Sequence, residues 1–149
     1  MREIKFRAWD KEYKRMSEGY PLGSFLKYSD NWFGGRIRFK SDTHTEDAPL
    51  SDCEIMQYTG LKDKAGTEIY EGDILLESAP RGNKYKVWRE KGGLVINAFA
   101  DDFNKPIEKI NFWSAIADQQ TIGFIEDNLS IIGNIYQTPQ LISNQSLTK

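Results

Sequence analysis

The clearest structural signal in this sequence is residues 57–74, which read Gln57-Tyr58-Thr59-Gly60-Leu61-Lys62-Asp63-Lys64-Ala65-Gly66-Thr67-Glu68-Ile69-Tyr70-Glu71-Gly72-Asp73-Ile74. A β-prone run leads into a polar turn that ends at Gly66, and glycine adopts positive φ without steric cost. The strand pattern that follows is interrupted by Gly72, which favours a bulge or a close backbone approach at a barrel corner. This stretch predicts short strands joined by a tight turn.

The residues before this stretch also favour strands. Residues 2–9 alternate with a period of two, residues 10–14 read as a turn, and a returning strand is expected from Arg15. Residues 17–31 contain glycine, proline and Asp-Asn, which are typical of a loop. Basic and apolar residues alternate again over residues 36–40, which predicts another strand.

Towards the C-terminus, residues 85–89 and 94–99 are strand candidates, and the glycine pair between them indicates a hairpin. Residues 101–120 are ambiguous, because Ile107 and Ile110 fit a short helix as well as a strand. A last strand is expected over residues 131–136. One turn of helix is expected near residues 140–142.

Many short strands with at most one or two helices indicate a mainly β protein with an α+β margin, built around a small β-barrel. Residues 41–52 are polar and read as an exposed linker. We therefore expect a β-rich N-terminal region over residues 1–48, a barrel domain over 49–142 and a disordered tail over 143–149.

Composition restricts the class of protein. The 149 residues are 39% hydrophobic and 28% charged, which suits a soluble domain with one core or two small ones. No apolar run is long enough to span a bilayer, and no secretory signal follows Met1, so we expect a cytoplasmic protein. Cys53 is the only cysteine, so it forms no intramolecular disulfide, and we interpret it as a small buried hydrophobe.

The net charge of −2 hides an uneven distribution. Residues 1–40 contain ten Lys/Arg against five Asp/Glu, whereas residues 41–79 contain two against ten. Such asymmetry is typical of an interaction surface or of two oppositely charged faces of one monomer. It motivates the prediction that the protein self-associates, or binds another protein, through patches of opposite charge.

Catalytic and metal-binding readings have little support. Asp42, His44 and Glu46 would share one face of an extended chain, but a catalytic metal needs rigid support that a linker does not supply. No phosphate-binding loop or nucleophile elbow is present. We expect no enzyme activity, no metal and no cofactor.

Nucleic-acid binding is the alternative function. Nine of the nineteen aromatic residues lie in the first forty positions, interleaved with Lys and Arg. Small β-barrels bind single strands by stacking bases on exposed aromatics while cations contact phosphates. The competing interpretation places these aromatics in the core and the cations on an ordinary wet strand face. The candidate nucleic-acid residues are Trp9, Lys27, Trp32, Phe33, Arg36, Arg38 and Lys40.

Three segments together resemble the YopX family of phage and prophage proteins. They are residues 6–10 (Phe-Arg-Ala-Trp-Asp), the stretch 57–74 quoted above, and residues 132–136 (Ile-Gly-Asn-Ile-Tyr). The resemblance spans nearly the whole chain, although residues 17–52 and 80–128 contribute little to it. It implies an SH3-like β-barrel with an additional N-terminal region, encoded by a mobile element in a bacterial host cell.

The resemblance implies no activity, because the family brings no catalytic residues. We interpret its motifs as structural: the Thr59 to Asp63 segment would fix a hairpin register, and the Asp73 carboxylate would bind backbone N–H groups beside Gly72. The structural motif residues are Trp9, Asp10, Thr59, Gly60, Asp63, Gly66, Tyr70, Gly72, Asp73, Gly133 and Asn134.

Overall fold

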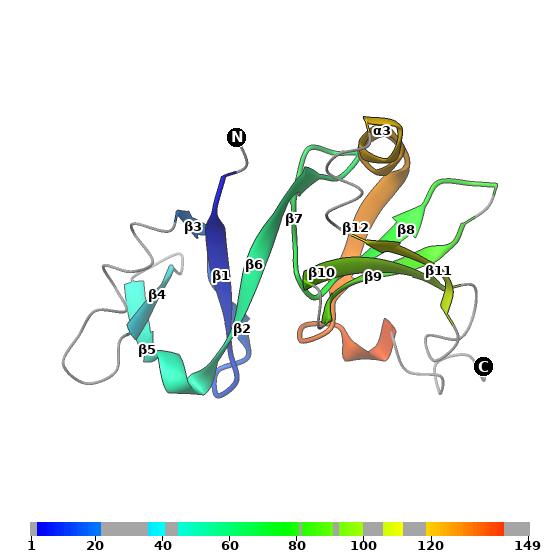
Figure 1. Cartoon of the computed structure of the whole chain (residues 1–149). Coiled ribbons are helices and arrows are strands. Elements are labelled where there is room, and N and C mark those ends of the chain that lie inside the picture. Colours follow the sequence, from blue (N-terminus) through cyan, green and yellow to red (C-terminus); the bar gives the residue numbers. More distant parts are fainter. Residues whose placement is uncertain are drawn as a thin grey trace. The chain divides into compact units, whose positions relative to one another are not determined.

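The computed structural model describes residues 3–21, 36–40, 45–80, 82–90, 93–99, 106–111 and 119–141. The chain divides into two compact units, Met1–Tyr58 and Thr59–Lys149, and each is described by itself. The described residues are mainly β (Figure 1). The strands and helices of the first unit are β1 (Lys5–Asp10), β2 (Arg15–Met16), β3 (Tyr20–Pro21), β4 (Arg36–Lys40), β5 (Thr45–Pro49), η1 (Leu50–Asp52) and the start of β6 (Cys53–Lys62).

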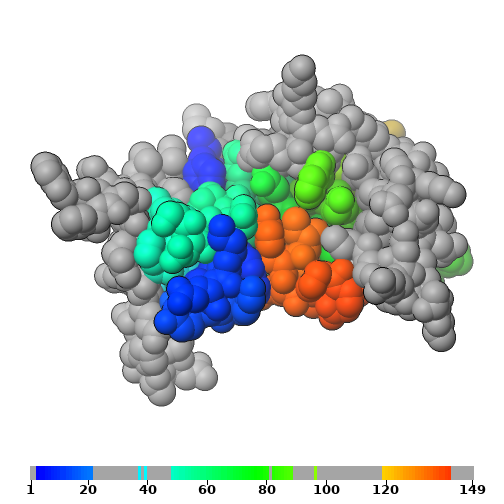
Figure 2. All heavy atoms as spheres, turned by 90° about the horizontal axis from the view of Figure 1, so that it is seen from below, coloured from blue at the N-terminus to red at the C-terminus, as the bar shows by residue number. Residues whose placement is uncertain are grey.

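The first unit is organised around β1. This strand pairs antiparallel with β2, β3 and β6, and the β6 register runs from Phe6 opposite Gln57 to Asp10 opposite Cys53. The hairpin expected at residues 10–16 is therefore confirmed. In Figure 2 the blue β1–β2 hairpin lies beside the cyan segment that leads from β5 into β6, in agreement with this pairing.

The segment between residues 45 and 52 corrects the linker prediction. β5 pairs with β4, with Ile37 opposite Ala48, and both residues are buried in a core with Ala8, Phe39 and Cys53. Ala48 of this polar stretch belongs to the core and Leu50 packs against it, so a mostly polar sequence forms a paired strand here. The first compact unit extends to Tyr58, and β6 pairs with β1 as far as Gln57.

The second unit contains a curled sheet with the antiparallel order β11-β10-β9-β8-β12 (Figure 1). The hairpin predicted from the Gly92–Gly93 pair is confirmed, since β9 and β10 pair along their length. The fold class is the one expected, while the SH3-like closure remains a prediction. The elements are β7 (Glu68–Tyr70), β8 (Asp73–Glu77), β9 (Lys84–Glu90), β10 (Gly93–Phe99), β11 (Pro106–Asn111), α3 (Gln119–Asn128), β12 (Leu129–Asn134) and η2 (Pro139–Leu141).

Two assignments in this unit differ from the sequence expectation. Residues 106–111 form β11, and the short helix considered there is wrong, because Ile110 pairs with Ile96 in the sheet. The helix instead begins at Gln119, and Ile125 from its inner side is fully buried in the core. The predicted tail, residues 143–149, lies outside the described residues.

The core of the second unit joins the sheet to α3. The ring of Phe124 from the helix meets that of Tyr85 from β9 edge-on, with centroids 6.4 Å apart. Burial of such aliphatic and aromatic side chains stabilises the fold by roughly 1.5–3 kcal/mol each. The buried residues of this cluster are Leu61, Ile69, Leu75, Tyr85, Val87, Ile96, Ile125 and Leu129.

Candidate functional site

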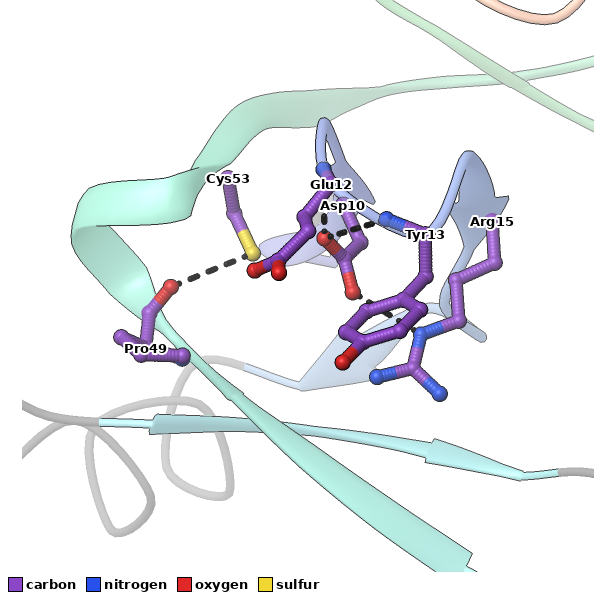
Figure 3. A network of polar contacts seen from close by, with 6 residues as sticks. All are labelled: Asp10, Glu12, Tyr13, Arg15, Pro49 and Cys53. Atoms are coloured by element: carbon purple, nitrogen blue, oxygen red, sulfur yellow. Dashed lines mark hydrogen bonds and ion pairs between the residues drawn. The ribbon is translucent and has the colours of Figure 1, made fainter.

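The turn after β1 is built around the carboxylate of Asp10, which is fully buried (Figure 3). One oxygen, Oδ1, accepts the backbone N–H groups of Glu12 and Tyr13 at 3.0 and 3.3 Å. The other, Oδ2, accepts the Arg15 Nε–H at 2.9 Å. A buried carboxylate is stable only when its oxygens have such partners, so Asp10 fixes the tight turn between β1 and β2.

Arg15 links this turn to the core of the first unit. Its guanidinium carbon lies 5.1 Å from the ring centroid of Tyr13 and 4.6 Å from that of Phe39. Both distances lie within the range of a cation–π contact. The guanidinium is thus shared between two rings and the Asp10 carboxylate, which makes it a structural cross-link.

Cys53 lies near the same turn, and its thiol has low nucleophilic reactivity. Its thiol donates to the Pro49 carbonyl at 3.4 Å (Figure 3). Burial, followed by the negative charges of Asp10 and Asp52, raises the pKa of this thiol from 9.0 to about 11. Because the thiolate is the nucleophilic form, Cys53 is unsuited to nucleophilic catalysis at neutral pH.

The motif of residues 59–67 forms the turn between β6 and β7 in the second unit. Buried Thr59 donates its hydroxyl to the Ile69 carbonyl at 2.7 Å, across the two strands, and Gly60 follows it in β6. Asp63 accepts the N–H groups of Ala65 and Thr67 with Oδ1, and that of Ile131 with Oδ2 at 3.0 Å. Asp63 therefore joins this turn to β12, which lies 68 residues away in sequence.

The second motif joins β8 to the end of β12. The carboxylate of Asp73, 1% exposed, accepts the Tyr70 N–H at 2.8 Å and the Asn134 side-chain amide at 3.1 Å. Gly72 has φ 91° and its backbone bonds to Val87 and Ile135, so the close backbone approach expected there is present. The side chains of both motifs thus form hydrogen bonds with one another and with backbone groups of the second unit.

Gly133 and Asn134 hold the segment after β12. The N–H of Asn134 donates to the Thr138 hydroxyl at 2.8 Å, and the Asn134 side chain accepts the Tyr136 N–H at 2.9 Å. A methyl group on Gly133 would overlap Thr138 and lie 2.6 Å from a methyl carbon of Leu141. Glycine at this position lets η2 and the residue before it pack against β12.

Of the predicted nucleic-acid set, the structure describes the side chain of Trp9 and the backbone of Arg36, Arg38 and Lys40. Trp9 is 6% exposed, so its ring is not open for base stacking. Arg36, Arg38 and Lys40 lie on β4, whose alternate residues Ile37 and Phe39 are buried. Lys27, Trp32 and Phe33 lie outside the described residues, and their role stays a prediction.

The Asp42, His44 and Glu46 trio lies largely outside the described residues. Asp42 and His44 lie outside the described residues, and only the backbone of Glu46 is described, in β5. Within the described ranges, no three His, Cys, Asp or Glu side chains are grouped so that they could hold a metal ion. No helix in those ranges is long and apolar enough to cross a membrane.

A row of two half-buried lysines and one exposed tryptophan on β9 is a feature that sequence reasoning missed. Tyr85 and Val87 are buried in the core, so Lys84, Lys86 and Trp88 lie on the opposite face of the strand. Trp88 is 39% exposed, and the Lys86 ammonium lies 4.3 Å from the centre of its ring. The alternation was visible in the sequence, but which face would meet solvent was not.

The comparisons with known proteins agree with the motifs. A family model described as YopX protein matches residues 5–143. One similar solved structure is the crystal structure of protein EF1440 from Enterococcus faecalis, which is 27% identical over 96% of this chain and 100% of that chain, with a TM-score of 0.54. No match was found among curated proteins.

Proposed function

The chain belongs to the YopX family, and from this membership we propose that it is a non-enzymatic binding or assembly module that associates with a second copy of itself or with another protein. Phage or prophage coding, and action in the cytoplasm of a bacterial host, form part of this proposal through the family resemblance. The motif residues then stabilise the fold, and residues on the protein surface bind the partner.

The single observation that carries the proposal is the way the motif carboxylates are used. Asp10, Asp63 and Asp73 are all buried, and each accepts hydrogen bonds from backbone N–H groups of its own unit. General acid–base catalysis needs a carboxyl group within reach of a substrate proton. These three side chains instead hold turns, and the only thiol has a raised pKa.

Self-association is supported by the charge distribution. Residues 1–40 carry an excess of five positive charges, and residues 41–79 an excess of eight negative ones. Opposite patches attract across subunits, and salt screens that attraction, since the Debye length falls to about 3 Å at about 1 M ionic strength.

Sedimentation velocity at about 0.05 M and about 1 M NaCl tests this proposal. We expect a species larger than a monomer at low salt that dissociates at high salt. Glu71→Lys, inside the acidic segment, should weaken association more than Asp127→Lys, which makes the same charge change on the exposed side of α3. A strict monomer at both salt concentrations refutes self-association, and equal effects of the two variants refute its assignment to the acidic segment.

A further inference from the structure

The turn between β1 and β2 presents an exposed aromatic ring. Tyr13 is 66% exposed, more than any other large hydrophobic residue in the part of the chain that the structure describes. Its ring centroid lies 5.1 Å from the Arg15 guanidinium, and its backbone N–H donates to Asp10 Oδ1 at 3.3 Å (Figure 3). A buried carboxylate and a cation therefore hold in place a side chain that buries little area in its own unit.

An aromatic ring that is held in this way is suited to contact another protein. Tyrosine has two side-chain torsions, so it supplies a large contact area at a low cost in conformational entropy. Asp10 and Arg15 reduce that cost further, because they restrict the backbone and the ring before a partner arrives. Tyrosine is also enriched among the residues that dominate the energy of protein interfaces. The arrangement of Tyr13 thus indicates an interaction surface.

Lys14, the next residue, has a strained backbone. Its φ is 54°, and it is the one non-glycine residue with positive φ among those described. Glycine takes this conformation without steric cost, whereas any other side chain makes it less favourable. Within the described residues, no hydrogen bond or ion pair involves the exposed Lys14 ammonium. A lysine here lowers stability without making a contact inside its own chain, which favours a role for its charge in binding.

Charges of both signs surround Tyr13. The Lys11 ammonium lies 3.7 Å from the Glu54 carboxylate, with both side chains half-exposed, and the Lys11 N–H donates to the Asp52 carbonyl at 3.0 Å. In Figure 2 the turn and the segment that leads into β6 lie side by side on one face of the first unit. The residues called the β1–β2 turn surface below are Lys11, Glu12, Tyr13, Lys14, Asp52 and Glu54.

This mixture of charges indicates the class of partner. Two lysines against three carboxylates leave the surface with a net charge of −1, so it offers a polyanion such as nucleic acid no net attraction. A second copy presents the same mixture. In an isologous contact around a two-fold axis, a lysine of each copy can lie opposite a carboxylate of the other.

We propose that the β1–β2 turn surface is the site of self-association, where the Tyr13 rings of two copies meet near a two-fold axis and Lys14 of each copy pairs with Asp52 of the other. This inference rests on the proposed self-association and assigns it to particular residues. Lys14 and Asp52 are the pair because neither has an ion pair within the described residues, whereas Lys11 and Glu54 pair within one copy. Lys14 belongs to the basic segment 1–40 and Asp52 to the acidic segment 41–79.

Sedimentation of the full-length protein at about 0.05 M NaCl tests the role of the tyrosine. Tyr13→Ala should raise the dissociation constant of the dimer about thirtyfold, as expected for a residue that dominates an interface. Tyr13→Phe keeps the ring and should change that constant by less than about threefold. Trp88→Ala is the matched control, since it removes an exposed aromatic ring from the second unit and should leave the dimer intact.

A glycine variant separates binding from stability at Lys14. Lys14→Gly relieves the unfavourable φ, so the melting temperature should stay the same or rise. The same variant removes the charge, so the dimer should weaken. A lysine with a purely structural role would give the opposite result, with a lower melting temperature and an unchanged dimer.

Charge exchange tests the pairing of Lys14 with Asp52. Lys14→Asp and Asp52→Lys should each dissociate the dimer, because each variant places like charges opposite one another. When the two variants are mixed, both contacts again join opposite charges, so a mixed dimer should form. Lys62→Asp makes the same charge change at an exposed position outside the β1–β2 turn surface and should have little effect. Asp52→Lys should also weaken the dimer more than Glu71→Lys, which lies outside this surface.

Two outcomes would overturn the inference while the proposed self-association stands. One is an oligomer at low salt that a folded Tyr13→Ala variant leaves intact. The other is a mixture of Lys14→Asp and Asp52→Lys that remains monomeric. A strict monomer of the unaltered protein at low salt would instead remove the self-association itself, so the two failures are distinguishable. Binding of a labelled oligonucleotide that Tyr13→Ala abolishes would show that the partner is nucleic acid and that the inference is wrong.

Discussion

Replacing Asp63 with alanine removes the carboxylate that accepts hydrogen bonds from three backbone N–H groups. Two of them, from Ala65 and Thr67, belong to exposed residues of the turn between β6 and β7. The third belongs to Ile131 in β12, which is half-buried. The substitution should therefore loosen the turn and detach it from the strand that it joins.

The magnitude follows from the access of water to each N–H group. An N–H group left unsatisfied away from water costs about 1–3 kcal/mol, which is the expected contribution of Ile131. Water replaces the acceptor at the two turn residues, so each of those bonds contributes about 0.5–1 kcal/mol. We expect Asp63→Ala to lower the free energy of unfolding by about 3 kcal/mol.

Urea unfolding with linear extrapolation measures this loss, and amide hydrogen exchange localises it. Asp63→Asn should show an intermediate loss, because it keeps one carbonyl oxygen but places an NH₂ group where the second oxygen was. Asp127→Ala removes an exposed carboxylate on α3 and should change stability by less than about 0.5 kcal/mol. An Asp63→Ala variant as stable as Asp127→Ala, with the Ile131 amide still protected, would refute the reasoning.

Three further predictions concern other parts of the chain. Cys53 should react slowly with iodoacetamide near pH 8 until the protein unfolds, and fast reaction at pH 8 would contradict this. The pKa of its thiol is about 11 in the folded protein and 9.0 ordinarily, so the contribution of Cys53 to stability should fall as pH rises from 9.0 to about 11. Gly133→Ala should lower the free energy of unfolding in urea by about 1–3 kcal/mol, because the added methyl group overlaps the segment that leads into η2. Gly123→Ala has open space beside it in α3 and should be neutral or stabilising by up to about 1 kcal/mol. The reverse order would show that packing at Gly133 does not require glycine. Tyr85→Phe removes the 2.7 Å hydrogen bond to the Glu77 carboxylate and should lower the melting temperature, corresponding to about 1–3 kcal/mol, and an unchanged melting temperature would count against this bond.

Local patterning predicted the elements whose residues alternate clearly. The returning strand after Asp10 and the β9–β10 hairpin follow from a period of two and from turn residues. The helix α3 was missed although Ile122, Ile125 and Leu129 have helical spacing, since Gly123 and several polar residues weaken the pattern.

Some segments adopt their secondary structure because of the strand they pair with, which the local sequence pattern does not reveal. Residues 106–111 fit either period, and pairing with β10 selects the strand. The polar stretch of β5 reads as a linker until Ala48 is seen opposite Ile37. The Trp88 and Lys86 contact depends on which face of β9 the core covers, and that choice is made by strands and a helix elsewhere in the chain.

The bonds from Asp63 to Ile131 and from Asp73 to Asn134 span 68 and 61 residues. Because a ribosome releases the chain from its N-terminus, both aspartates emerge long before the groups that they bind. A nascent chain that stops before β12 therefore contains Asp63 and Asp73 without the hydrogen-bond donors of Ile131 and Asn134. The second unit is complete only after β12 has emerged, and premature termination before β12 should yield a product that quality-control proteases remove.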